Sequence, residues 1–178
     1  MSFRHPVKPP CRGADPTLDR RRLLAAAAAC GGVAALAGVG CAKPPPPPPP
    51  PTLLELDLRT APELNPDLRG RPSPLVLRTY ELKTRAAFDA ADFFSLWDRE
   101  KETLGAELVA RDELVLQPGA TGRRIERRAQ EDTRVFAVVA AFRDIERARW
   151  RDAVPVLPQQ THRLELQLAA RELALRRL

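Results

Sequence analysis

Two stretches of the chain alternate strictly between leucine and polar residues. Residues 54–58 read Leu-Glu-Leu-Asp-Leu, and residues 164–168 read Leu-Glu-Leu-Gln-Leu. Because successive side chains of a strand point to opposite faces, this period of two predicts strands with one buried and one solvated face. Thr133–Phe142 is apolar on both faces, which predicts a strand in the middle of a sheet.

Shorter strand-like segments lie between these three. They are Leu75–Leu82, Leu108–Arg111, Glu113–Leu116 and Arg123–Ala129. Pro155 and Pro158 predict an edge strand or an irregular segment ahead of the last alternating stretch. Seven or eight short strands separated by turn residues predict a mainly β protein with a two-sheet β-sandwich.

One segment between the predicted strands has a helical period instead. Thr84 is its expected N-cap and Gly105 its expected end. Two sets of residues fit an apolar helical face: Ala87, Ala91, Phe94 and Trp97, or Phe93, Leu96 and Trp97. Both alternatives stay open, and either one predicts a short helical insertion in the sandwich.

The N-terminal part of the chain differs in composition from the predicted sandwich. Arg20, Arg21 and Arg22 precede Leu23–Gly40, an uncharged run of 18 residues that is mostly alanine and glycine. A membrane span needs about 20 strongly apolar residues, so we interpret this weakly hydrophobic run as a removable export signal. The arginines fit a conventional signal or a twin-arginine signal, and the export route stays open.

A cysteine follows this run directly. Gly38-Val39-Gly40-Cys41 resembles the lipobox of bacterial lipoproteins, in which the cysteine is acylated and becomes the new N-terminus. Gly38 departs from that pattern, which favours leucine there. Cys30 is a rival cleavage point, but it would leave a short apolar segment before it and an exposed apolar tail after it. Cys41 is therefore the predicted lipidation site, and residues 1–40 are the predicted signal peptide.

Eight consecutive prolines, Pro44–Pro51, separate Cys41 from the predicted domain. Proline fixes φ and has no amide donor, so such a run favours an extended polyproline II rod of roughly 25 Å. We expect residues 41–51 to form a lipidated linker, residues 52–171 the folded domain and residues 172–178 a frayed tail.

Charge and cysteine content narrow the possible functions. The net charge of +6 is carried mostly by the signal, because residues 41–178 contain 23 basic and 21 acidic residues. This near-balance gives little support for nucleic-acid binding. No cysteine follows Cys41, so the predicted domain has neither a disulfide nor a catalytic thiol.

The predicted domain also lacks a recognisable catalytic or metal-binding pattern. His162 is its single histidine, and we expect it to be an ordinary surface or edge residue of a strand. Ser73 and Ser95 lie in no nucleophile motif, and the carboxylates do not cluster as metal ligands. We expect no enzyme activity, cofactor or metal. The alternative is a periplasmic ligand-binding or enzymatic lipoprotein with a hidden site, which would require a large apolar pocket.

An ordered series of motifs resembles the TssJ/VasD family of type VI secretion outer-membrane lipoproteins. The motifs include Asn65-Pro66-Asp67, Gly70-Arg71-Pro72-Ser73-Pro74-Leu75, Tyr80-Glu81-Leu82, Ala91-Asp92-Phe93-Phe94-Ser95-Leu96, Leu116-Gln117-Pro118-Gly119 and Val138-Val139-Ala140-Ala141-Phe142-Arg143-Asp144. The resemblance implies a transthyretin-like β-sandwich with a helical portion. It also implies a lipid anchor in the outer membrane, on the periplasmic side, and binding to the periplasmic part of the inner-membrane protein TssM. Ala42 agrees with this location, because it replaces the aspartate that retains such lipoproteins in the inner membrane. The octaproline linker is no part of the family pattern.

The loop Ala61–Pro72 is the predicted partner contact. It is rich in turn residues, yet it carries two leucines. Exposed apolar side chains on a proline-stiffened loop lose little entropy when a partner orders them. The family resemblance also places TssM contact between the first two strands. The predicted contact residues are Leu64, Asn65, Asp67, Leu68 and Arg69. The alternative is that the leucines fold back to cover the sandwich edge.

Overall fold

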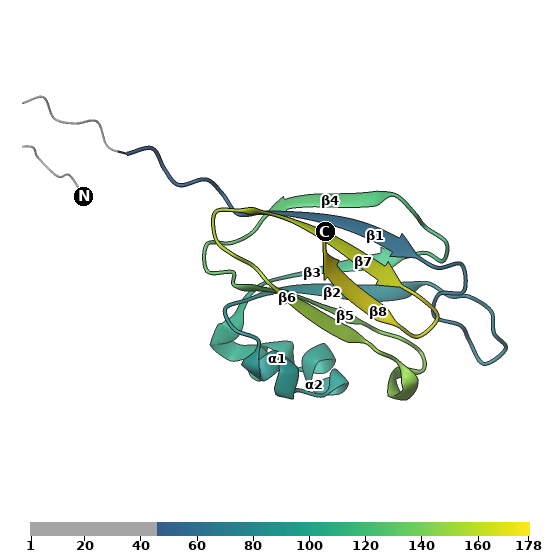
Figure 1. The fold of residues 1–178 in the computed structure, drawn as a ribbon. Coiled ribbons are helices and arrows are strands. Elements are labelled where there is room, and N and C mark those ends of the chain that lie inside the picture. The colour runs from purple at the N-terminus through teal and green to yellow at the C-terminus, as the bar shows by residue number, and fades with distance from the viewer. Residues whose placement is uncertain (1–45) are drawn as a thin grey trace, which may run out of the picture. The chain divides into compact units, whose positions relative to one another are not determined.

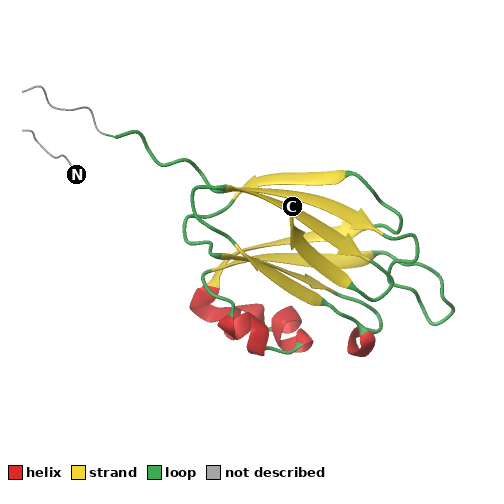
Figure 2. Ribbon diagram, viewed as in Figure 1, coloured by secondary structure: helices red, strands yellow, loops and turns green. Residues whose placement is uncertain are grey.

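A computed structural model describes residues 46–178, which form two four-stranded β-sheets packed face to face (Figure 1). Short helices lie outside one of the sheets, as the colouring by secondary structure shows (Figure 2). The predicted two-sheet sandwich with a helical insertion is confirmed. Pro46–Pro51 are exposed and belong to neither a helix nor a strand. The predicted signal peptide, the rival Cys30 and the predicted lipidation site Cys41 lie outside the described residues.

The first sheet has the strand order β4-β1-β7-β8. Its strands are β1 (Leu53–Thr60), β4 (Arg123–Arg128), β7 (Thr161–Leu168) and β8 (Leu173–Arg177). Both stretches of alternating leucines are confirmed as half-buried strands, and they pair with each other in parallel, with Leu56 opposite Leu164. The leucines of β1 and β7 supply much of the core between the sheets.

β8 corrects the prediction that residues 172–178 form a frayed tail. Leu173 and Leu175 are buried in the inter-sheet core, and the strand pairs with β7 in antiparallel register. Asp152 of the other sheet accepts a hydrogen bond from the amide of Leu175 at 3.0 Å. The tail is therefore ordered by its hairpin with β7, by burial in the core and by the contact with Asp152.

The second sheet has the strand order β3-β2-β5-β6. Its strands are β2 (Leu75–Leu82), β3 (Leu108–Leu116), β5 (Val135–Ala140) and β6 (Arg151–Pro155). The two short segments predicted before and after Asp112 are one continuous strand, β3. β6 lies at the edge, as its proline predicted, and β5 lies inside the sheet.

β5 is apolar on both faces because it is covered on both. Phe136, Val138 and Ala140 belong to the core between the sheets, whereas Val135 and Val139 belong to a second core beneath the helices. All six residues of β5 are buried. The helices therefore form a third layer, and this layer explains why β5 is apolar on both faces.

Three short helices form this layer: α1 (Ala86–Ala90), α2 (Phe93–Asp98) and α3 (Glu100–Leu104). Thr84 is not the N-cap, which corrects the sequence prediction. Asp92 instead caps α2, because its carboxylate accepts a hydrogen bond from the amide of Ser95 at 3.0 Å. This cap restarts the helix after the extended backbone of Ala91.

Every member of the second predicted apolar face packs in the core beneath the helices, and the first face fails only at Phe94, because Ala87, Ala91 and Trp97 pack there as well. Leu96 is fully buried, and Phe93 and Trp97 pack against the same core, whereas Phe94 is 61% exposed. The rings of Phe93 and Trp97 stack at 5.4 Å between centroids. Gly105 ends α3 as expected, with a positive φ of 48°, and it begins a 3₁₀ turn, Gly105–Glu107, that leads into β3.

Candidate functional site

The loop between β1 and β2 extends beyond the ends of the strands (Figure 1). The two leucines of this loop have opposite environments. Leu64 is 0% exposed and belongs to the core between the sheets, whereas Leu68 is 108% exposed. The expectation that both leucines are exposed is therefore wrong for Leu64, which covers the end of the sandwich.

Asn65 fixes the base of this loop. Its side-chain Nδ2 donates a hydrogen bond to the carbonyl of Pro74 at 2.9 Å, and its Oδ1 accepts one from the amide of Arg143 at 2.8 Å. Its own amide donates to the carbonyl of Ala170 at 3.2 Å. Asn65 is buried and has a φ of 49°, a conformation that asparagine tolerates better than most residues. It therefore joins three separate loops at this end of the domain.

Asp67 organises the tip of the loop. Its Oδ1 accepts hydrogen bonds from the amides of Arg69 and Arg71 at 2.8 and 2.9 Å, and its Oδ2 accepts one from the Arg71 side chain at 2.8 Å. These bonds, first of all the one from the Arg71 amide, lower the pKa of the Asp67 carboxyl. Gly70, with a φ of 78°, closes the turn by donating to the carbonyl of Asp67. The tip is thus held in one shape with Leu68 projecting from it.

The five predicted contact residues therefore fall into two groups. Leu68 and Arg69 are exposed at the tip, and Asp67 lies beneath them as the organiser of the turn. Leu64 and Asn65 are buried, so their side chains support the loop from inside. Turn chemistry in the sequence identifies the tip, but it does not separate these two roles.

Charged residues from two other loops surround the β1–β2 loop. An open hollow of about 1050 Å³ lies among these loops. Its lining includes Arg143, Asp144 and Arg147 after β5, and Arg171 between β7 and β8. Asp144 pairs with Arg171 at 2.9 Å. Residues 143–150 are rich in charged side chains, but the sequence gives no sign that they lie beside the predicted contact loop.

His162 corrects another expectation, because it is buried rather than at the surface. Its Nδ1 accepts a hydrogen bond from Arg177 at 2.6 Å, which leaves the proton on Nε2 to be donated to the carbonyl of Leu157 at 2.8 Å. Both ring nitrogens are therefore engaged in holding the start of β7. Within residues 46–178, no group of three or more histidines, cysteines or carboxylates is arranged to hold a metal.

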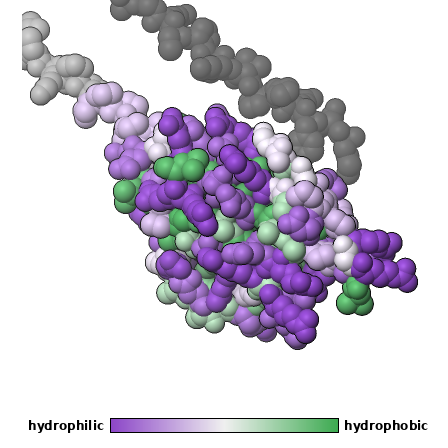
Figure 3. Space-filling model, turned by 45° about the vertical axis from the view of Figure 1, so that its right-hand side comes forward, coloured by the Kyte–Doolittle hydropathy of each residue, from purple (hydrophilic) through white to green (hydrophobic). Residues whose placement is uncertain are grey.

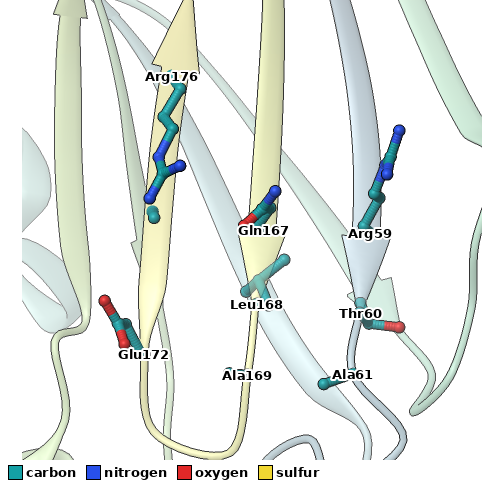
Figure 4. A pocket seen from close by; sticks show the side chains of 9 residues that line it. Arg59, Thr60, Ala61, Gln167, Leu168, Ala169, Glu172 and Arg176 are labelled. Atoms are coloured by element: carbon teal, nitrogen blue, oxygen red, sulfur yellow. The ribbon is translucent and has the colours of Figure 1, made fainter.

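The hollows of the described region are shallow or very small. One hollow of about 360 Å³ lies on the outer face of the first sheet (Figure 4). Arg59, Gln167 and Arg176 line it from three neighbouring strands. Arg59 and Gln167 both contact Glu165, at 3.2 and 3.0 Å. The apolar gap between the sheets is only about 10 Å³.

The surface is mostly hydrophilic on the face that Figure 3 shows, with hydrophobic residues in small separate groups. The exposed large hydrophobic residues of the described chain are Leu53, Leu68, Phe94, Val115, Leu157 and Leu178. None of the helices within residues 46–178 is long and apolar enough to cross a membrane.

Comparison with known proteins identifies the family. Residues 52–171 match the family model described as type VI secretion lipoprotein, VasD, EvfM, TssJ, VC_A0113. The crystal structure of the type VI secretion lipoprotein TssJ1 from Pseudomonas aeruginosa is 45% identical, with a TM-score of 0.70. The match covers 72% of this chain and 98% of that one. No curated protein matches the chain significantly.

Two more distant structures support the fold alone. Serratia marcescens Lip, a membrane-bound component of the type VI secretion system, is 24% identical with a TM-score of 0.63, over 71% of this chain and 96% of that one. A structure described as the TssM C-terminal domain from EAEC is 24% identical with a TM-score of 0.57, over 71% and 98%. Fold and comparisons together define a secretion-system lipoprotein built on a two-sheet β-sandwich. Within that class, the chain belongs to the type VI secretion lipoprotein family of TssJ and VasD.

Proposed function

We propose that this chain is a structural subunit of a type VI secretion trans-envelope complex. It is anchored through an acylated Cys41 on the periplasmic side of the outer membrane, and it binds the periplasmic part of a TssM-like inner-membrane protein. Family membership supports the secretion role and a structural rather than an enzymatic activity.

The filled core favours this proposal over the alternative of a ligand-binding or enzymatic lipoprotein. That alternative needs a large apolar pocket with converging polar groups. The apolar gap between the sheets, about 10 Å³, is far below the size of such a pocket. The hollow of about 1050 Å³ beside the β1–β2 loop is open and lined largely by charged residues, and the hollow on the outer face of the first sheet is open as well.

The observation that carries the proposal is the presentation of Leu68. A fully exposed leucine is held on a tip whose backbone is fixed by Asp67, and the base of the loop is fixed by Asn65. A preorganised loop loses little conformational entropy on binding, so an apolar side chain at its tip is suited to fill a pocket on a partner. Arg69 beside it supplies a charged contact at the rim.

Leu68→Ala tests the proposal. We expect this variant to bind the purified periplasmic domain of the TssM-like protein at least about tenfold more weakly, because it truncates a central apolar anchor. Its thermal midpoint should be unchanged, because Leu68 makes no buried contact. Surface plasmon resonance measures the binding, and calorimetry measures the midpoint.

Two further variants separate contact from folding. Leu157→Ala removes an exposed leucine at the opposite end of the domain, so binding and stability should both stay at the level of the parent. Leu64→Ala should lower the free energy of unfolding by about 2–5 kcal/mol, because Leu64 is a fully buried core residue. Unchanged binding by Leu68→Ala would exclude the loop, and the surface around Phe94 and Trp97 would then be the next candidate.

A further inference from the structure

β3 is an edge strand of the second sheet and, with nine residues, the longest strand of the described chain. Within residues 46–178 it pairs with β2 and with no other strand. A free edge carries a row of unpaired N–H and C=O groups, which makes it a template for another strand. The two sheets have four such edges, and they differ in how well each is protected.

The other three edges carry familiar forms of protection. β4 has four arginines among its six residues, and β6 has five residues and ends at Pro155. The edge of β8 is covered by Asp152, which accepts the hydrogen bond from the Leu175 amide. Like charge, proline and covering side chains are the usual means by which an edge strand avoids pairing. β3 has no proline, and its charged residues are confined to its middle.

Every second residue of β3 points its backbone N–H and C=O groups away from β2. The carbonyl of Val76 in β2 accepts a hydrogen bond from the amide of Ala141, which follows β5. The backbone N–H and C=O groups of the even-numbered residues of β2 therefore point toward β5, and those of the odd-numbered residues point toward β3. The register pairs residues 77 and 79 with residues 114 and 112. Arg111, Glu113 and Val115 are therefore left with backbone groups that point away from β2. The register shift affects only the start of β3.

The sequence of β3 is complementary to itself when read in the opposite direction. Residues 108–116 are Leu-Val-Ala-Arg-Asp-Glu-Leu-Val-Leu. An antiparallel pair of two copies, centred on Asp112, places Arg111 of each copy opposite Glu113 of the other. It also places the apolar triplet at each end opposite the other apolar triplet. Opposite charges and apolar residues are both favourable cross-strand pairs. Odd-numbered residues meet odd-numbered ones in this register, so the outward N–H and C=O groups face each other.

The charges inside the chain are compatible with this pairing. Arg111 already contacts Glu100 at 2.8 Å, and Glu113 contacts Arg78 at 2.8 Å. Contacts between Arg111 and Glu113 of two copies would extend these pairs into a continuous row of alternating charges. Asp112 would meet its own copy at the two-fold axis, where each carboxylate has Arg127 at 3.6 Å as a counter-charge.

We propose that β3 is a self-association edge whose occupant is the β3 of a second copy of this chain. The two strands pair antiparallel in the register centred on Asp112, and the two second sheets join into one sheet of twice the width. This surface lies on a sheet edge rather than on the β1–β2 loop. The proposal is therefore independent of the function proposed above.

Disulfide trapping tests the register directly. Asp112→Cys is introduced into the full chain, and the purified product is oxidised. Residue 112 of each copy would form a non-hydrogen-bonded pair with a Cα separation of about 4.5 Å, which a disulfide can bridge. We expect a covalent dimer, and mass spectrometry of the non-reduced digest should find residue 112 linked to residue 112.

Val115→Cys is the matched control on the same edge. In the proposed register, its two copies lie six residues apart along the strands, about 20 Å, so they cannot cross-link. The parent chain measures any cross-linking through its own cysteines. Adding Arg111→Glu to Asp112→Cys places like charges opposite each other twice, and it should lower the cross-linked fraction about tenfold.

Each outcome decides the proposal. A 112–112 cross-link without a 115–115 cross-link, weakened by Arg111→Glu, supports it. Equal cross-linking at both positions would indicate random collision and overturn it. Absence of a 112–112 cross-link in a folded protein would overturn it as well. Folding of each variant is checked by circular dichroism before oxidation.

Discussion

Leu64 and Asn65 are buried, although they lie in a loop that the sequence predicts to be exposed. The hydrogen-bond partners of Asn65 lie in three different loops, and two of them, Arg143 and Ala170, are remote in sequence. Turn chemistry predicts the loop itself, since it depends on neighbouring residues. It does not predict the burial of Asn65, because that burial is decided by segments that arrive much later in the chain.

Tyr80 is a second residue whose environment is set by distant segments. It is the single tyrosine of the chain and is fully buried beneath the helices. Its hydroxyl donates a hydrogen bond to the carbonyl of Leu96 at 3.2 Å. Burial raises the pKa of the Tyr80 phenol to about 12.

The raised pKa makes the stability of the folded state depend on pH in a definite direction. The folded-state pKa lies above that of an unfolded tyrosine, about 10, so the folded state favours the protonated phenol. The stability linked to Tyr80 is full below pH 10 and falls as the pH rises toward 12. Absorbance at the phenolate band should report one transition near pH 12 in the folded protein. A midpoint near 10 while circular dichroism stays native would contradict the buried position of Tyr80.

At the scale of elements, the strands with a strong local pattern are the ones that the sequence predicts well. The predicted limits of Leu75–Leu82 agree with β2, and the apolar run of β5 identifies an interior strand. β8 escapes prediction because only Leu173 and Leu175 mark its buried face and two arginines follow. The interruption between α1 and α2 also escapes, because it depends on the use of Asp92 as a cap rather than as a surface residue.

Arg151 links the helical layer to the second sheet. It lies in β6, and its guanidinium donates hydrogen bonds to the carbonyls of Phe88, Asp89 and Ala91 at the end of α1. These carbonyls belong to the last turn, where a helix lacks internal partners and where a cation is favoured. Arg151 thereby fixes the position of a helix of only five residues.

Arg151→Met should loosen α1 while leaving the sandwich folded. Methionine keeps part of the side-chain volume but cannot donate to the three carbonyls. We expect faster hydrogen exchange at the amides of residues 86–91, and a loss of global stability of about 1–3 kcal/mol. Arg147→Met is the control, since Arg147 lies exposed before the same strand. Equal exchange in the two variants would show that Arg151 does not hold the helix.

At the scale of the whole molecule, the two sheets share one core, so damage to either sheet should spread to the other. β8 contributes Leu173 and Leu175 to that core, together with leucines of β1, β2 and β7. The sequence could predict the sandwich from its strand patterns. The strand order could not be predicted, because it depends on pairings such as β1 with β7 that no local pattern reveals.

Leu175→Asp tests whether the last strand belongs to this shared core. A carboxylate without a partner would replace a buried leucine, at a cost of several kcal/mol, which is comparable with the stability of a whole domain. We expect cooperative loss of the β-sheet signal and a strongly lowered thermal midpoint. Leu178→Asp, three residues further on at an exposed position, should leave the midpoint unchanged. Equal midpoints in the two variants would mean that residues 173–178 behave as a tail.

The parallel pairing of β1 with β7 has a consequence for the way in which the chain acquires its structure. β1 is an interior strand, and its partner begins 108 residues later, at Thr161 opposite Leu53. Contacts between such distant residues require a large loop to close first, and this slows folding. The first sheet cannot assemble until almost the whole chain has been synthesised. A chain that is still being synthesised can pair β1 with β4, but the other side of β1 stays unpaired until β7 has been made. The sandwich is therefore completed only after its last strands have been synthesised.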